Sequence, residues 1–146
     1  DIEDAFKAKT SKKEAKEYEE KASALQEKMR KLLKKDKLNV KLEKLKNKKV
    51  SSILTVSEEG RRMQDMMKMY SMNGMGMDGM DPEETLVLNA GHPLVSYVLS
   101  HEDAEDAPLV CRQLYDLAKI ANAPLSAEEM SSFIERSNQI LERLFH

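Results

Sequence analysis

The feature that most constrains the fold of this chain is the concentration of methionine in residues 61–80. Eight of the ten methionines lie in this segment, which passes from a helical pattern into a glycine-rich loop. Methionine side chains are flexible and specify the shape of a core poorly, but they suit an adaptable apolar surface. The segments on either side are therefore expected to form the frame that holds this surface.

Length and composition favour a single folded domain. The 146 residues are 40% hydrophobic and 34% charged, with no Trp, which is typical of a helix-rich domain with one core. The apolar runs fall well short of the roughly 20 residues that a transmembrane helix requires. Cys111 is the only cysteine, so no internal disulfide can form, which fits a reducing compartment. We therefore expect a cytoplasmic protein without membrane contact.

Apolar spacing in the first half of the chain predicts one helix followed by strands. Because the chain begins at Asp1, we expect a fragment, with residues 1–10 as a linker or tail from a preceding domain and residues 11–146 as the domain. Ser11 and Glu14 have the spacing of a capping box, and apolar residues three and four apart continue the helix to about Lys35. The alternating segment 38–45 predicts a strand, and the β-branched segment 50–56 predicts its antiparallel partner.

The second half of the chain predicts a third strand and further helices. Residues 84–89 have the pattern of a strand, and Pro93 suits the first position of a short helix. Helices are also predicted for residues 107–121 and 126–145, the second opened by a capping box. The predicted fold is thus α+β: a small three-stranded sheet with an N-terminal helix, an amphipathic methionine-rich helix that begins after Ser57, and a C-terminal helix pair.

The last two helices carry more apolar surface than a small sheet can cover. Two antiparallel helices with spare apolar area commonly pair with a second copy to form a four-helix bundle about a twofold axis. We therefore predict a homodimer. The residues predicted for its interface are Leu109, Val110, Leu114, Leu117, Met130, Phe133, Ile134, Ile140, Leu141, Leu144 and Phe145.

The sequence contains no recognisable catalytic or metal-binding pattern. The glycine-rich loop lacks the lysine and the helix start of a phosphate-binding loop. One cysteine and unpaired histidines do not make a structural zinc site. His92 is interpreted as a hydrogen-bonded turn residue and Cys111 as apolar packing. We therefore predict that this chain is not an enzyme and holds no metal or cofactor.

The methionine segment leaves three interpretations open. Part of its helical face can fill the core, and thioethers can also bind copper(I). The third interpretation is a flexible contact surface for many partners, favoured for Met69, Met72, Met75 and Met77. Residues 1–49 carry 17 Lys and Arg against 10 Asp and Glu, so a methionine-rich module that binds RNA and signal sequences is an alternative. The lysines are spread around helix faces, however, which favours a solvated basic helix.

Three segments together resemble the C-terminal domain of the heat-shock protein 90 chaperones, of the bacterial type. The first is residues 50–56 followed by the methionine-bearing helix. The second is residues 86–95, which resemble the family's L-x-x-N-x-x-H-P stretch followed by two hydrophobic residues. The third is the helix pair at 107–121 and 126–145. The resemblance covers residues 11–145.

The resemblance implies a permanent dimerisation module whose four-helix interface comes from the last two helices. It also implies that the methionine-bearing helix and loop contact unfolded or partly folded client proteins, with Met66, Met69 and Tyr70 at matching positions. The family's ATPase, with its ATP and Mg²⁺, belongs to an N-terminal domain outside this chain, and co-chaperones are further partners, whereas nucleic acid is not. The full set of predicted client-binding residues is Met63, Met66, Met67, Met69, Tyr70, Met72, Met75 and Met77.

Overall fold

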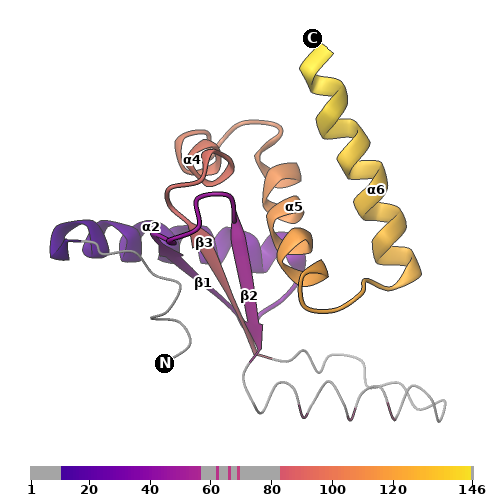
Figure 1. The fold of residues 1–146 in the computed structure, drawn as a ribbon, viewed down its shortest axis with the longest axis horizontal. Coiled ribbons are helices and arrows are strands. Elements are labelled where there is room, and N and C mark those ends of the chain that lie inside the picture. Colours follow the sequence, from indigo (N-terminus) through magenta and orange to yellow (C-terminus); the bar gives the residue numbers. More distant parts are fainter. Residues whose placement is uncertain (1–10, 57–61, 63–65, 67–68, 70–82, 146) are drawn as a thin grey trace.

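The fold is a three-stranded sheet with helices packed on it (Figure 1). The computed structural model describes residues 11–56, 62, 66, 69 and 83–145. The predicted α+β class is confirmed, with the N-terminal helix preceding the sheet. The elements are, in order, α2 (Lys12–Leu33), β1 (Leu38–Glu43), β2 (Ser52–Val56), β3 (Glu84–Asn89), α4 (Pro93–Ser100), α5 (Ala107–Ile120), α6 (Ala127–Glu142) and the 3-10 turn η1 (Arg143–Phe145).

The order of the strands differs from the prediction. The sheet order is β1-β3-β2, so β3 lies between the two strands that were expected to pair. β1 pairs with β3 in parallel, whereas β2 pairs with β3 antiparallel. The predicted β1–β2 hairpin is therefore wrong. The central position suits β3 because it is the most buried of the strands.

The main core lies on one face of this sheet. Val40 pairs with Leu86 and Leu42 with Leu88, while Leu54 of β2 also faces Leu86. Directly paired residues share a face of a sheet, so these side chains form one apolar layer. The helices that pack against this layer contribute Ala22, Leu25 and Met29 from α2, Val95 and Val98 from α4, and Cys111, Leu114, Tyr115 and Ala118 from α5.

Asn89 ties the β1–β2 connection to the end of the central strand. Its side chain is buried, with Oδ1 accepting from the backbone N–H groups of Leu45 at 3.2 Å and Gly91 at 3.0 Å. Its Nδ2 donates to the carbonyl oxygens of Val50 at 2.7 Å and Asn47 at 3.3 Å. This use of a single buried amide explains why an asparagine stands at the end of β3, where the chain turns into α4.

The predicted helix starts are confirmed by their caps. Ser11 accepts a hydrogen bond from the Glu14 N–H at the start of α2, and Ser126 and Glu129 form a complete capping box at the start of α6. Pro93 occupies the first turn of α4, where His92 Nδ1 accepts from the Leu94 N–H at 3.1 Å. His92 was predicted as a hydrogen-bonded turn residue, and its hydrogen bond makes it the N-terminal cap of α4.

Two predicted segments cannot be compared with the structure. Residues 1–10 and most of the methionine segment, including Met63, Met67, Tyr70, Met72, Met75 and Met77, lie outside the described residues. Among the residues that are described, no helix has the length and hydropathy needed to cross a membrane.

Candidate functional site

The candidate site is the surface of α6, which lies outside α5 (Figure 1). α5 stands between the sheet and α6, and the C-terminal end of α6 projects beyond it. Because α6 touches the rest of the domain chiefly through α5, only one side of α6 is in contact with the domain. The residues on the side of α6 that faces α5 and those on the side that faces solvent therefore determine which function this helix can have.

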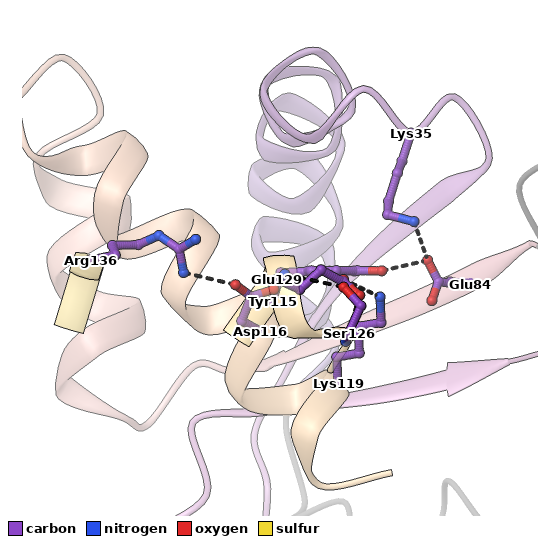
Figure 2. A network of polar contacts seen from close by, with 8 residues as sticks. All are labelled: Lys35, Glu84, Tyr115, Asp116, Lys119, Ser126, Glu129 and Arg136. Atoms are coloured by element: carbon purple, nitrogen blue, oxygen red, sulfur yellow. Dashed lines mark hydrogen bonds and ion pairs between the residues drawn. The ribbon is translucent and has the colours of Figure 1, made fainter. Parts of the chain in front are cut away.

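The side of α6 that faces α5 is joined to it by polar contacts. Arg136 Nη1 donates to Asp116 Oδ2 at 2.8 Å and to Gln113 Oε1 at 3.2 Å. Lys119 Nζ donates to Glu129 Oε2 at 2.6 Å. Figure 2 shows Arg136 reaching Asp116 across the gap between the helices, with Lys119 and Ser126 both close to Glu129. We call this set of contacts the polar seam.

The polar seam continues along α6. Gln113 Nε2 donates to Ser137 Oγ at 2.8 Å. The same Ser137 hydroxyl donates to the carbonyl oxygen of Phe133, one turn earlier in α6, at 2.7 Å. Near the end of α6, Arg143 Nη1 lies 3.8 Å from Asp106 Oδ2. Charged or polar pairs thus link α5 and α6 from the first turn of α6 to its last.

The ion pair between Arg136 and Asp116 is the most buried contact of the polar seam. Arg136 is buried, and Asp116 is only slightly exposed. A buried ion pair contributes little net stability, but loss of one partner is costly because the other charge stays desolvated. The Arg136–Asp116 pair therefore specifies how α6 sits on α5 more than it stabilises the domain.

The Glu129 carboxyl is ionised in this setting. Its burial alone would raise its pKa, but the hydrogen bonds from Lys119 Nζ and the Ser126 N–H outweigh burial and hold the pKa of Glu129 below its usual value. The first turn of α6 also favours a negative charge, because the helix dipole is positive there. The Lys119–Glu129 pair is accordingly charged at neutral pH.

Large apolar side chains of α6 and of the turn η1 that follows it are exposed to solvent. The exposed fractions are 52% for Ile134, 56% for Leu141, 77% for Leu144 and 85% for Phe145. Leu117 and Ile120 of α5 are also exposed large apolar side chains. We call these six exposed residues, which come from α5, α6 and η1, the outer apolar face. Exposed apolar patches on soluble domains commonly mark interaction sites.

The structure divides the predicted interface residues into three groups. Ile134, Leu141, Leu144, Phe145 and Leu117 lie on the outer apolar face. Leu114 lies in the domain's own core and leaves almost no surface for a partner. The half-buried remainder consists of Leu109, Val110, Met130, Phe133 and Ile140.

Another buried charge joins β3 to α2 and α5. Glu84 is buried at the start of β3, and its Oε1 accepts from Tyr115 Oη at 2.8 Å and lies 3.4 Å from Lys35 Nζ. Figure 2 shows Lys35 and Tyr115 converging on this carboxylate from different elements. Burial, followed by the charge and hydrogen bond of Glu84, raises the pKa of Tyr115, so the phenol stays a neutral donor.

Two of the predicted client-binding methionines belong to the described residues. Met66 is 48% exposed and Met69 is 65% exposed. Both have helical backbone conformation. Their exposure places apolar, flexible side chains in contact with solvent, which is the arrangement that an adaptable contact surface requires.

Sequence reasoning missed Arg136 and Glu84. Arg136 lies three residues after Phe133 and four before Ile140, so its spacing places it on the same helical face as two apolar residues. That position was a usable signal for a buried charge facing α5. Glu84 gave no such signal, because its partners Lys35 and Tyr115 are distant in the sequence.

No metal-binding group can be assembled from the described part of the chain. Within residues 11–56, 62, 66, 69 and 83–145, no cluster of three or more His, Cys, Asp or Glu side chains could hold an ion. Cys111 is buried on the core side of α5, and desolvation raises its pKa to about 11. A thiol in this state is neutral at physiological pH and is a poor nucleophile.

Comparison with known proteins adds no family. No protein-family model and no curated protein matches this chain.

Proposed function

We propose that this chain is the homodimerisation module of an ATP-dependent chaperone, equivalent to the C-terminal domain of the heat-shock protein 90 family. The observation that carries the proposal is the orientation of α6. Its inner side meets α5 through the polar seam and carries the half-buried Met130, Phe133 and Ile140, whereas Ile134 and Leu141 are exposed to solvent. The resemblance of residues 50–56, 86–95 and the last two helices to that family supports the same conclusion.

A second copy of this chain is the partner that fits the outer apolar face. The face belongs to two neighbouring helices, and a twofold axis would bring it against its own equivalent to form a four-helix bundle. Such a bundle would cover Ile134, Leu141, Leu144 and Phe145, the apolar residues that α6 leaves in solvent. An interface between identical copies also needs no charge complementarity, which suits a face made of aliphatic and aromatic side chains.

The proposed mechanism is mechanical. A permanent joint at the C-terminal end keeps two nucleotide-driven arms at high effective concentration, so that they meet without a separate encounter. ATP and Mg²⁺ would be bound by the arms and not by this module. The module's own contribution to client handling would be the methionine surface, of which Met66 and Met69 are exposed.

Client contact through methionine would be weak and promiscuous. Flexible thioether side chains can repack against differently shaped apolar surfaces, so they bind many partners without high affinity for one. This is the behaviour that partly folded proteins require of a chaperone.

The joint is tested by placing charges in the outer apolar face. The double variant Leu141→Lys with Leu144→Lys buries unpaired charges if the face is an interface, so it is expected to be a folded monomer by light scattering. The matched control is Ser131→Lys with Gln139→Lys, which adds the same charge at exposed polar positions of α6 and should leave the dimer intact. A double variant that keeps the natural mass would contradict the proposed interface.

The client surface is tested separately. Met66→Ser with Met69→Ser should weaken suppression of the aggregation of a heat-denatured model protein, while the mass of the dimer stays unchanged. Unchanged suppression would remove these two residues from the proposed surface without affecting the joint.

A further inference from the structure

A hollow lies on the side of the domain where α2, α4 and α5 meet. Its volume is about 300 Å³. This is at the lower end of the range for small-molecule sites, which are mostly apolar with a few polar groups that fix orientation. The wall is apolar and comes from all three helices: Leu25, Met29, Leu32, Val98, Ala107 and Cys111.

The wall of the hollow offers nothing polar to a ligand. Leu25, Met29 and Val98 belong to the core, and the described residues contain no buried side-chain nitrogen or oxygen that lacks a partner. Cys111 contributes a thiol that burial keeps neutral. A polar or charged group placed against this wall would lose its hydration without compensation, so the wall selects an apolar tail.

The rim of the hollow is charged and carries an excess of positive charge. Lys28 and Lys31 stand one turn apart on α2, and Glu102 follows α4. Lys28 Nζ lies 3.4 Å from Glu102 Oε2, and both side chains are largely exposed. Lys31 is exposed and adds a second positive charge to the rim. An anionic head group would therefore be favoured at this rim.

We propose that this hollow binds a small single-chain amphiphile, a free medium-chain carboxylate, with its alkyl tail against the α2–α4–α5 wall and its carboxylate at Lys28 and Lys31. The volume limits the tail to one short chain, which excludes a two-chain lipid seated in full. The ion pair between Lys28 and Glu102 spans the rim, so the carboxylate would compete with Glu102 for Lys28 as it enters.

The test uses Cys111 as a reporter. It is the only cysteine of the chain and it lines the hollow, so its rate of alkylation by iodoacetamide reports whether the hollow is filled. The reaction is run at alkaline pH, because burial raises the pKa of this thiol and the thiolate is the reactive form. Decanoate below its micellar concentration should slow this rate saturably, by about tenfold when it is present at ten times its dissociation constant. Decyltrimethylammonium, which has the same tail and the opposite charge, should protect far less.

The rim is tested by neutralising its lysines one at a time. Lys31→Gln or Lys28→Gln should raise the decanoate concentration for half protection by about twofold to fivefold, as expected for an exposed ion pair. Lys16→Gln, on an exposed position of α2 several turns away, is the matched control and should change nothing. These substitutions are at the surface, so all of the variants should fold.

The outcomes separate this inference from the proposed dimer. The hollow lies within one copy of the chain, so the monomeric Leu141→Lys, Leu144→Lys variant should be protected equally well. No protection by decanoate, or equal protection by decyltrimethylammonium, would overturn the inference. Protection by vesicles of anionic lipid with none by free decanoate would also overturn it, because the source of the head group would then be a membrane.

Discussion

The two faces of α5 are held to their neighbours by opposite kinds of contact. On one face, Leu114 and Ala118 are almost fully buried against the sheet and α2. On the other face, Asp116, Lys119 and Gln113 meet α6 through hydrogen bonds and ion pairs. The first face supplies the apolar burial that stabilises a domain. The second supplies less of it, because Met130, Phe133 and Ile140 of α6 are only half-buried and its Ile134 and Leu141 are exposed.

This difference shows how one small chain can combine a buried core with apolar side chains that stay exposed, as the proposed dimer requires. If α6 turned so that Ile134 and Leu141 also packed on α5, it would bury more apolar surface and leave fewer apolar side chains in solvent. The polar seam opposes that arrangement, since rotation of α6 would bury Asp116 and Lys119 against apolar residues and remove their partners. The seam therefore keeps the outer apolar face available, and four predictions test the contrast between the two faces of α5.

The largest effect is expected in the core. Leu88→Ala removes a fully buried side chain from the central strand, so the free energy of unfolding should fall by about 2–5 kcal/mol. Urea denaturation of the monomeric Leu141→Lys, Leu144→Lys protein measures this without a contribution from association. A loss below about 1 kcal/mol would mean that the sheet face is not the main source of stability.

A somewhat smaller effect is expected in the polar seam. Arg136→Met leaves the nearly buried Asp116 without its cation and should cost about 2–3 kcal/mol in the same monomeric background. The double variant Arg136→Met with Asp116→Leu removes both charges and should regain most of this loss. If the double variant were as unstable as the single one, the Arg136–Asp116 ion pair would itself stabilise the domain. The polar seam would then not differ from the apolar core in its contribution to stability.

A third prediction concerns Leu141: the loss of stability on truncating this side chain should depend on the protein concentration. Leu141→Ala removes an exposed side chain. In a Leu144→Lys background, where the single charge at the proposed interface is also expected to prevent association, it should change the stability by less than about 0.5 kcal/mol. In the proposed dimer of the natural chain the same change should lower the midpoint of unfolding, and more so on dilution, because folding and association would be linked. An equal effect in the two backgrounds would contradict a role for this side chain at an interface.

The smallest effect is expected from pH. The folded pKa of Glu129 is held below its usual value of 4.5, so the folded chain binds fewer protons at this group than the unfolded chain. Its contribution is therefore fully present above pH 4.5 and is lost as the pH falls through the lowered pKa. Because the pair is partly exposed, the contribution is at most about 1 kcal/mol. Comparison with Glu129→Gln across this range should show the difference in stability shrinking as the pH falls.

Local patterns predicted the elements well, because local physics determines them. The capping residues Ser11 and Ser126 and the proline at position 93 mark helix starts by hydrogen bonds to their own neighbours. The apolar stripe of the last helix was also evident from its spacing. These features involve residues within one or two turns of each other, so no tertiary information is needed to find them.

The strand order and the inner side of α6 could not be predicted in the same way. The insertion of β3 between β1 and β2 depends on pairing between segments more than 25 residues apart, such as Leu54 with Leu86. The side that α6 presents to α5 depends on Asp116 and Lys119, which belong to α5 and not to α6. Of the candidate site, the outer apolar residues other than Ile120 were in the predicted interface, but the exposed Ile120 and the buried Arg136 were not.

The most direct test of the central claim is the absolute mass of the natural chain in solution, measured by light scattering over a dilution series. The account predicts a mass twice the 16.7 kDa of the chain, and predicts that it persists on dilution, because the outer apolar faces of two copies cover each other. A mass of 16.7 kDa at every concentration would contradict the account, since the apolar side of α6 would then be stable in solvent without a partner.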